Sequence, residues 1–90
     1  MGERRQAKRM PRAGIIGYSV TVLEFREPKN LSLKGEIIDI SDIGMSIQTC
    51  YPLEPGHVLR FNEGIGHKVG IVVWGMHIKD NTYKVGIKFV

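Results

Sequence analysis

Residues 35–49 read GEIIDISDIGMSIQT, and this stretch is the clearest local indication of a β-fold. The segments 36–40 and 45–49 have the character of strands, and the residues between them favour a tight turn. Asp and Ser occur in turns because their side chains bond nearby backbone amides, and Gly44 is expected to supply a positive φ there. The stretch therefore predicts one strand that ends in a turn and returns as a second strand.

The same strand pattern extends over the rest of the chain. Apolar and polar side chains alternate from Tyr18 to Val22 and from Tyr83 to Phe89, so one set is buried and the other faces water. No window of eleven or more residues has convincing helical periodicity. We predict six strands at 18–22, 35–40, 45–49, 58–61, 68–77 and 83–89, with turns at 28–30, 52–56, 62–66 and 79–82. Short strands at this spacing favour an antiparallel barrel or sandwich, and closure of the sheet would remove exposed edges.

Length and composition limit the chain to one domain. Its 90 residues can bury one modest core, and 42% hydrophobic with 24% charged residues is ordinary for a globular protein. The longest apolar run, 69–76, is too short to cross a bilayer, and neither a signal peptide nor a myristoylation signal opens the chain. The single cysteine, Cys50, cannot form an internal disulfide. We therefore predict a cytoplasmic protein without membrane insertion.

The positive charge of the chain lies entirely in its first twelve residues. The formal net charge is +4, and residues 1–12 carry five basic residues against Glu3, which is also +4. Such an excess favours an anionic partner, although a solvated terminus or a remnant of expression cloning explains it equally well. We predict a flexible basic arm over 1–12 and a folded domain over 13–90.

Signals for catalysis and metal binding are weak. His57, His67 and His77 are ten residues apart, whereas sequence-local zinc ligands come in pairs two to five apart. The glycine-rich stretch 64–70 is GxGxxxG and precedes a strand pattern, so it is read as a hairpin loop rather than a dinucleotide site. Cys50 has no catalytic context, and the acidic residues form no metal-binding cluster. We expect neither an enzyme nor a cofactor or metal.

The turn sequence Asp39-Ile40-Ser41-Asp42-Ile43-Gly44 carries the remaining chemical signal. A turn alone explains its composition well. A functional interpretation is that Asp39 accepts the N1 and N2 protons of a guanine edge while the Ser41 hydroxyl and the turn amides hold a phosphate. Arginine side chains suit the rest of such a ligand, because they bind guanine or phosphate in pairs and stack on bases.

Residues 5–9 (RQAKR) have the pattern RxxxR, and residues 39–44 (DISDIG) have the pattern DxSxxG. Together these two motifs resemble those of PilZ domains, which bind cyclic di-GMP. Residues 35–41 are similar to the family's strand before the motif, 53–56 to its following turn, and 73–74 with 85–89 to its closing hairpin. Each motif alone recurs by chance, but both in order on a six-strand pattern are specific. The resemblance covers nearly the whole chain.

The resemblance implies a six-stranded antiparallel barrel with the RxxxR segment as an arm that closes over a ligand on the outer face of the barrel. In this sequence Arg5 and Arg9 would grip guanine and phosphate, and Gly44 would permit close backbone approach. Trp74 either borders the ligand or belongs to the core. Ile43 occupies a position where the family often has a small residue, and it is expected to narrow the pocket or shift the turn. The full implied set of ligand-binding residues is Arg4, Arg5, Arg9, Asp39, Ser41 and Gly44, with Lys8 and Trp74 as further candidates.

The expected function is that of a bacterial second-messenger receptor in which cyclic di-GMP orders the arm and a downstream protein partner reads the altered surface. A small barrel that binds single-stranded nucleic acid is the main alternative, although a stacking platform is hard to find in the sequence. A PilZ-like module that serves protein interaction without ligand is the third interpretation.

Overall fold

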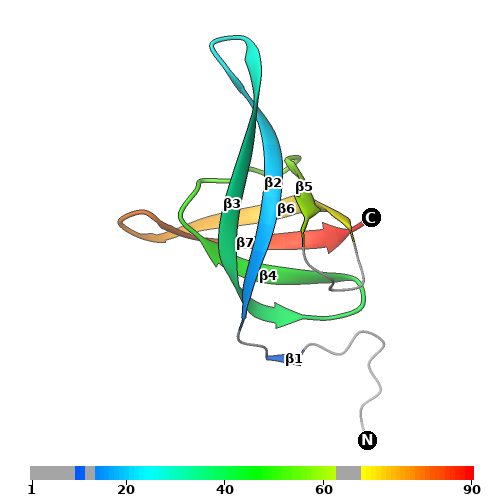
Figure 1. The fold of residues 1–90 in the computed structure, drawn as a ribbon. Coiled ribbons are helices and arrows are strands. Elements are labelled where there is room, and N and C mark those ends of the chain that lie inside the picture. The colour runs from blue at the N-terminus through cyan, green and yellow to red at the C-terminus, as the bar shows by residue number, and fades with distance from the viewer. Residues whose placement is uncertain (1–9, 12–13, 63–67) are drawn as a thin grey trace, which may run out of the picture.

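The computed structural model describes residues 10–11, 14–62 and 68–90, and every regular element among them is a strand (Figure 1). The bounds are β1 Met10–Pro11, β2 Ile15–Glu24, β3 Glu27–Ile40, β4 Gly44–Thr49, β5 Val58–Phe61, β6 Val69–Lys79 and β7 Thr82–Phe89. No helix in these residues is long and apolar enough to cross a membrane.

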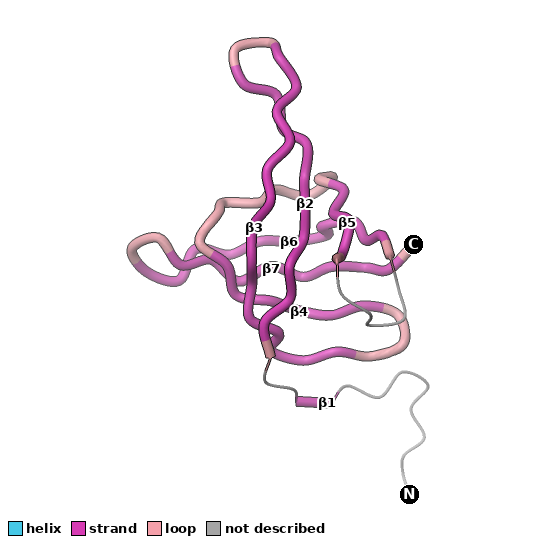
Figure 2. Tube along the Cα trace, in the orientation of Figure 1, coloured by secondary structure: helices cyan, strands magenta, loops and turns pink. Residues whose placement is uncertain are grey.

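Six of the strands close into a barrel. Their order is β3-β2-β5-β6-β7-β4, every pairing is antiparallel, and β4 pairs again with β3 to complete the ring. Figure 2 shows β2 and β3 crossing over the strands β4, β6 and β7. This arrangement confirms the predicted all-β fold with a closed six-stranded antiparallel barrel, and closure satisfies the backbone groups of what would otherwise be edge strands.

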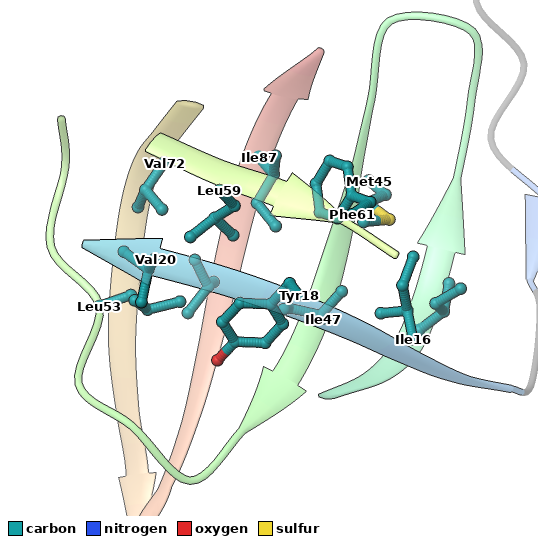
Figure 3. Packing of buried hydrophobic residues seen from close by; sticks show 12 residues of the cluster. Ile16, Tyr18, Val20, Met45, Ile47, Leu53, Leu59, Phe61, Val72 and Ile87 are labelled. Atoms are coloured by element: carbon teal, nitrogen blue, oxygen red, sulfur yellow. The ribbon is translucent and has the colours of Figure 1, made fainter. Parts of the chain in front are cut away.

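The side chains that face the inside of the barrel form the core (Figure 3). Ile16, Tyr18 and Val20 of β2 and Met45 and Ile47 of β4 belong to one buried cluster, and all five are at most 2% exposed. The sequence alternation therefore identified the buried face correctly. The remaining members of the buried cluster are Ile37, Leu53, Leu59, Phe61, Val72, Val85 and Ile87.

The phenol of Tyr18 is buried in this core and titrates at high pH. Its hydroxyl lies 2.7 Å from Thr49 Oγ1, and burial raises the pKa of Tyr18 above its ordinary value of 10.0. Well below pH 10 the tyrosine is neutral in both the folded and the unfolded chain. As pH rises further, the unfolded form ionises first, so the free energy of unfolding falls.

We therefore expect Tyr18→Phe to weaken the alkaline loss of stability, while costing about 1 kcal/mol at pH 8 through the lost hydrogen bond. Urea unfolding of the wild type and of Tyr18→Phe between pH 8 and pH 11 measures how the free energy of unfolding changes with pH in each protein. Equal slopes of stability against pH in this range would show that Tyr18 is not the responsible group.

The longest hairpin, β2 with β3, extends beyond the barrel (Figure 1), and its turn differs from the predicted one. The turn is at Phe25 and Arg26, which both have positive φ, whereas the expected turn residues 28–30 lie inside β3. Two-residue turns with positive φ usually contain Asn or Gly, so Phe-Arg gives no turn signal. Pro28 is tolerated because this part of β3 pairs with β2 alone among the described strands, opposite Leu23.

The predicted arm over 1–12 lies mostly outside the described residues, which exclude 1–9 and 12–13. Its residues Met10–Pro11 form β1, which pairs antiparallel with β3 opposite Ile40 and Asp39. The chain that follows the RxxxR segment is thus joined to the strand that carries the first residue of DxSxxG.

Candidate functional site

The turn between β3 and β4 is held by the Ser41 hydroxyl. Ser41 Oγ donates to the Gly44 carbonyl at 3.3 Å and accepts from the Ile43 amide at 3.3 Å, and the Ser41 amide donates to the same carbonyl at 2.8 Å. Ser41 is buried, at 9% exposure. The interpretation of this sequence as a turn is therefore correct, and the Ser41 hydroxyl stabilises the turn itself.

Gly44 does not have the positive φ that was predicted for it in this turn. Among the described glycines only Gly56 has a positive φ, so the predicted positive φ at Gly44 is wrong. The reason for glycine is instead the close approach of β7, because an added Cβ would overlap the Ile87 carbonyl oxygen. Gly44 thus permits close approach of a neighbouring strand.

Four residues form a row across the outer face of the barrel. Asp39 of β3 pairs with Ser46 of β4, Ser46 with Gly86 of β7, and Gly86 with Trp74 of β6. Directly opposed residues of antiparallel strands project from the same face of the sheet. Pro11 of β1 pairs with Asp39 and extends the row on its other side. The strands that carry this row can be followed in Figure 1.

A β-bulge directs Asp39 outward. Ile37 pairs with Ile47 and Asp39 with Ser46, so two residues along β3 correspond to one along β4. Simple alternation would place Asp39 on the same face as the buried Ile37. Because of the bulge, Asp39 lies opposite Ser46 on the outer face.

A second β-bulge does the same for Trp74. Val72 pairs with Ile87 while Trp74 pairs with Gly86, so Val73 is the extra residue in β6. Val72 is 1% exposed and Trp74 is 41% exposed. Trp74 therefore lies on the outer face, and the alternative that it belongs to the core is wrong.

The four residues of the row line a groove of about 210 Å³, together with Lys84 and the apolar residues Met45, Val73 and Ile87. The indole of Trp74 lies directly over Gly86, since an added Cβ there would overlap the indole atoms Nε1 and Cε2. A groove of this size is below the roughly 300–1,000 Å³ of sites for drug-sized ligands. It suits one planar ring rather than a whole dinucleotide.

Two other hollows contain none of the predicted site residues. One, of about 230 Å³, lies beside Lys34 and Cys50. The other, of about 550 Å³, lies at the base of the projecting hairpin, beside Val22 and Tyr51. Of these three hollows among the described residues, the groove of the row is the one that contains two of the predicted ligand-binding residues, Asp39 and Trp74.

The predicted site residues thus divide into three groups. Asp39 and Trp74 line one groove. Ser41 and Gly44 hold the adjacent turn and are not part of the groove lining, and Ile43 is exposed without narrowing the groove. The remaining predicted residues, Arg4, Arg5, Lys8 and Arg9, lie outside the described residues.

Besides the apolar residues of the groove lining, the sequence interpretation missed three residues that alternate with the core positions: Ser46, Lys84 and Gly86. Alternation already placed them on the face opposite the core, between buried neighbours such as Ile47 and Val85. A glycine inside a strand also indicates close approach of another group, here the indole of Trp74. Strand pairing, which brings the three together, could not be read from the sequence.

In the described part of the chain, no group of three or more His, Cys, Asp or Glu side chains could hold a metal ion. The fold and groove define a small all-β barrel with a polar and aromatic groove on its outer face. No protein-family model matches the chain, and no curated protein matches it significantly.

Proposed function

We propose that the protein is a cytoplasmic receptor for cyclic di-GMP, which it binds without chemical change at the groove of Asp39 and Trp74. The observation that carries the proposal is that these two residues, from strands that are not neighbours, line one groove on the outer face. A carboxylate can accept both protons of a guanine Watson–Crick edge, and an exposed indole can stack on the base.

The position of β1 supports a role for the RxxxR segment. Met10, which directly follows Arg9 in the sequence, pairs with Ile40, and Pro11 pairs with Asp39. The backbone that directly follows the RxxxR motif in the sequence therefore runs beside Asp39, a residue of the groove. Arg5 and Arg9 would then bind the phosphates and the second guanine, which the groove is too small to hold.

The energetics require both parts of the site. A bidentate contact from arginine to guanine is worth about 1–3 kcal/mol in protein–DNA complexes, and a micromolar affinity corresponds to about 8 kcal/mol. No single contact reaches that value. We infer that ligand binding orders the arm over the groove, and that a downstream protein partner recognises the resulting surface.

The only tryptophan of the chain lines the groove and so reports on the proposed binding. We expect cyclic di-GMP to change the fluorescence of Trp74 and to release heat in calorimetry, with the same affinity from both measurements. Arg9→Ala should weaken the affinity about 10-fold or more, because it removes a charge-assisted contact.

Three titrations separate the proposal from its alternatives. Unchanged binding by Arg9→Ala, or no heat with cyclic di-GMP, would contradict it. Binding of a short single-stranded oligonucleotide in preference to cyclic di-GMP would favour a nucleic-acid-binding barrel. A lack of response to either ligand would favour a module for protein interaction.

A further inference from the structure

Ser46 has a buried hydroxyl that the fold does not use. The side chain is 5% exposed, and its Oγ is the one buried side-chain polar atom without a hydrogen-bond partner among the described residues. Nearly all buried hydroxyls in folded proteins have a partner, so such an atom calls for an explanation. The other buried polar side chains on the same segment, Ser41 and Thr49, both have partners.

Ser46 lies on the side of β4 that faces the groove. Met45 and Ile47, on either side of it, face the core, so Ser46 projects to the outer face and lines the groove. Asp39 is its cross-strand neighbour on β3, and Gly86, which has no side chain, is its neighbour on β7. Ser46 is therefore part of the groove lining, and its cross-strand neighbour is the residue whose carboxylate is proposed to bind guanine.

We infer that Ser46 is a ligand-binding residue that contacts the same guanine edge as Asp39, an inference that depends on the proposed function. A serine hydroxyl can donate one hydrogen bond and accept two. The guanine edge has an acceptor, O6, next to the two donors that a carboxylate would bind, so a hydroxyl adjacent to Asp39 complements it. Adenine, with a donor at that place and no N1 proton, fits this pair less well.

Ser46→Ala is expected to have opposite effects on the stability of the free protein and on the affinity for cyclic di-GMP. In the free protein, Ser46→Ala removes a desolvated hydroxyl with no partner, so the midpoint of urea unfolding should stay the same or rise. In the complex, the same variant lacks a hydrogen bond to the base, and the affinity for cyclic di-GMP should fall about 5-fold. A purely structural serine would not produce this combination.

Ser32→Ala is the matched control, because Ser32 is an exposed serine of β3 that does not line the groove. It should leave both the unfolding midpoint and the affinity unchanged. The double variant Asp39→Asn/Ser46→Ala tests the shared edge: if both side chains hold one base, the two losses of affinity should be less than additive.

The outcomes are distinguishable. If the wild type binds and Ser46→Ala binds equally well, the role of Ser46 is excluded while the proposed function stands. Additive losses would place Ser46 on another part of the ligand and overturn the assignment to the base edge. A lower unfolding midpoint for Ser46→Ala would mean that the hydroxyl has a structural partner, which also overturns the inference. If the wild type does not bind cyclic di-GMP, both proposals fail together.

Discussion

Replacing Gly44 with alanine is expected to lower the free energy of unfolding by about 3 kcal/mol, the upper end of typical overpacking costs. The added Cβ would overlap the Ile87 carbonyl oxygen of β7. The obstacle is backbone in a paired strand, so a change of rotamer cannot relieve it. The Ile43 carbonyl also accepts a hydrogen bond from the Phe89 amide at 2.8 Å, which joins the turn to the same strand.

Urea unfolding of the Gly44→Ala variant measures this loss, and Gly14→Ala is its control. A Cβ at Gly14 would meet none of the described atoms within 4 Å, and the φ of Gly14 is not positive. The control should therefore be neutral or stabilising by about 0.4–1 kcal/mol, since alanine restricts the unfolded chain. Equal stabilities of the two variants would mean that β7 can move away from Gly44 at no cost.

Replacing Asp39 with asparagine is expected to weaken binding of cyclic di-GMP about 10- to 100-fold. Asparagine keeps the shape of the side chain but removes the charge and turns one acceptor into a donor that faces the donors of the guanine edge. Hydrogen bonds to a charged group are worth about 1.5–3 kcal/mol, which gives this range. Calorimetric titration measures the change.

Asp42→Asn is the matched control for Asp39, because Asp42 lies in the adjacent turn, is exposed and does not line the groove. Both variants remove one negative charge, so a general electrostatic effect on a ligand with two phosphates would affect them alike. Equal affinities for the two variants would contradict a specific role for Asp39. The unfolding midpoint of each variant should be measured as well, since Asp39 has further interactions within the fold.

The strands and the core were predictable from the sequence because they depend on local alternation. The segments 45–49, 58–61 and 83–89 match β4, β5 and β7 within one residue at each end. The turn of the β2–β3 hairpin was misplaced, because Phe25 and Arg26 adopt positive φ without the residue types that usually indicate it. Local signals thus determined the elements wherever the backbone followed its usual preferences.

The candidate site was only partly predictable. Asp39 and Trp74 were singled out by the motif and by residue type, but Ser46 and Gly86 were not. Nothing in the local sequence brings these four residues together, because they lie on four strands whose pairing is a property of the whole barrel. The way in which Ser41 and Gly44 serve the turn likewise depends on contacts that the folded chain makes: the hydrogen bond from Ser41 to the Gly44 carbonyl and the close approach of β7 to Gly44.

Local patterns in the sequence specify an all-β chain with a basic N-terminal segment and two spaced motifs. The pairing of strands in the barrel fixes which face Asp39 and Trp74 occupy. Strict alternation would place Asp39 with Ile37 and Trp74 with Val72, on the core side. One extra residue in β3 and one in β6 reverse that outcome, because a β-bulge shifts the alternation by one residue relative to the partner strand. These two bulges, which the local sequence does not predict, place Asp39 and Trp74 in one groove.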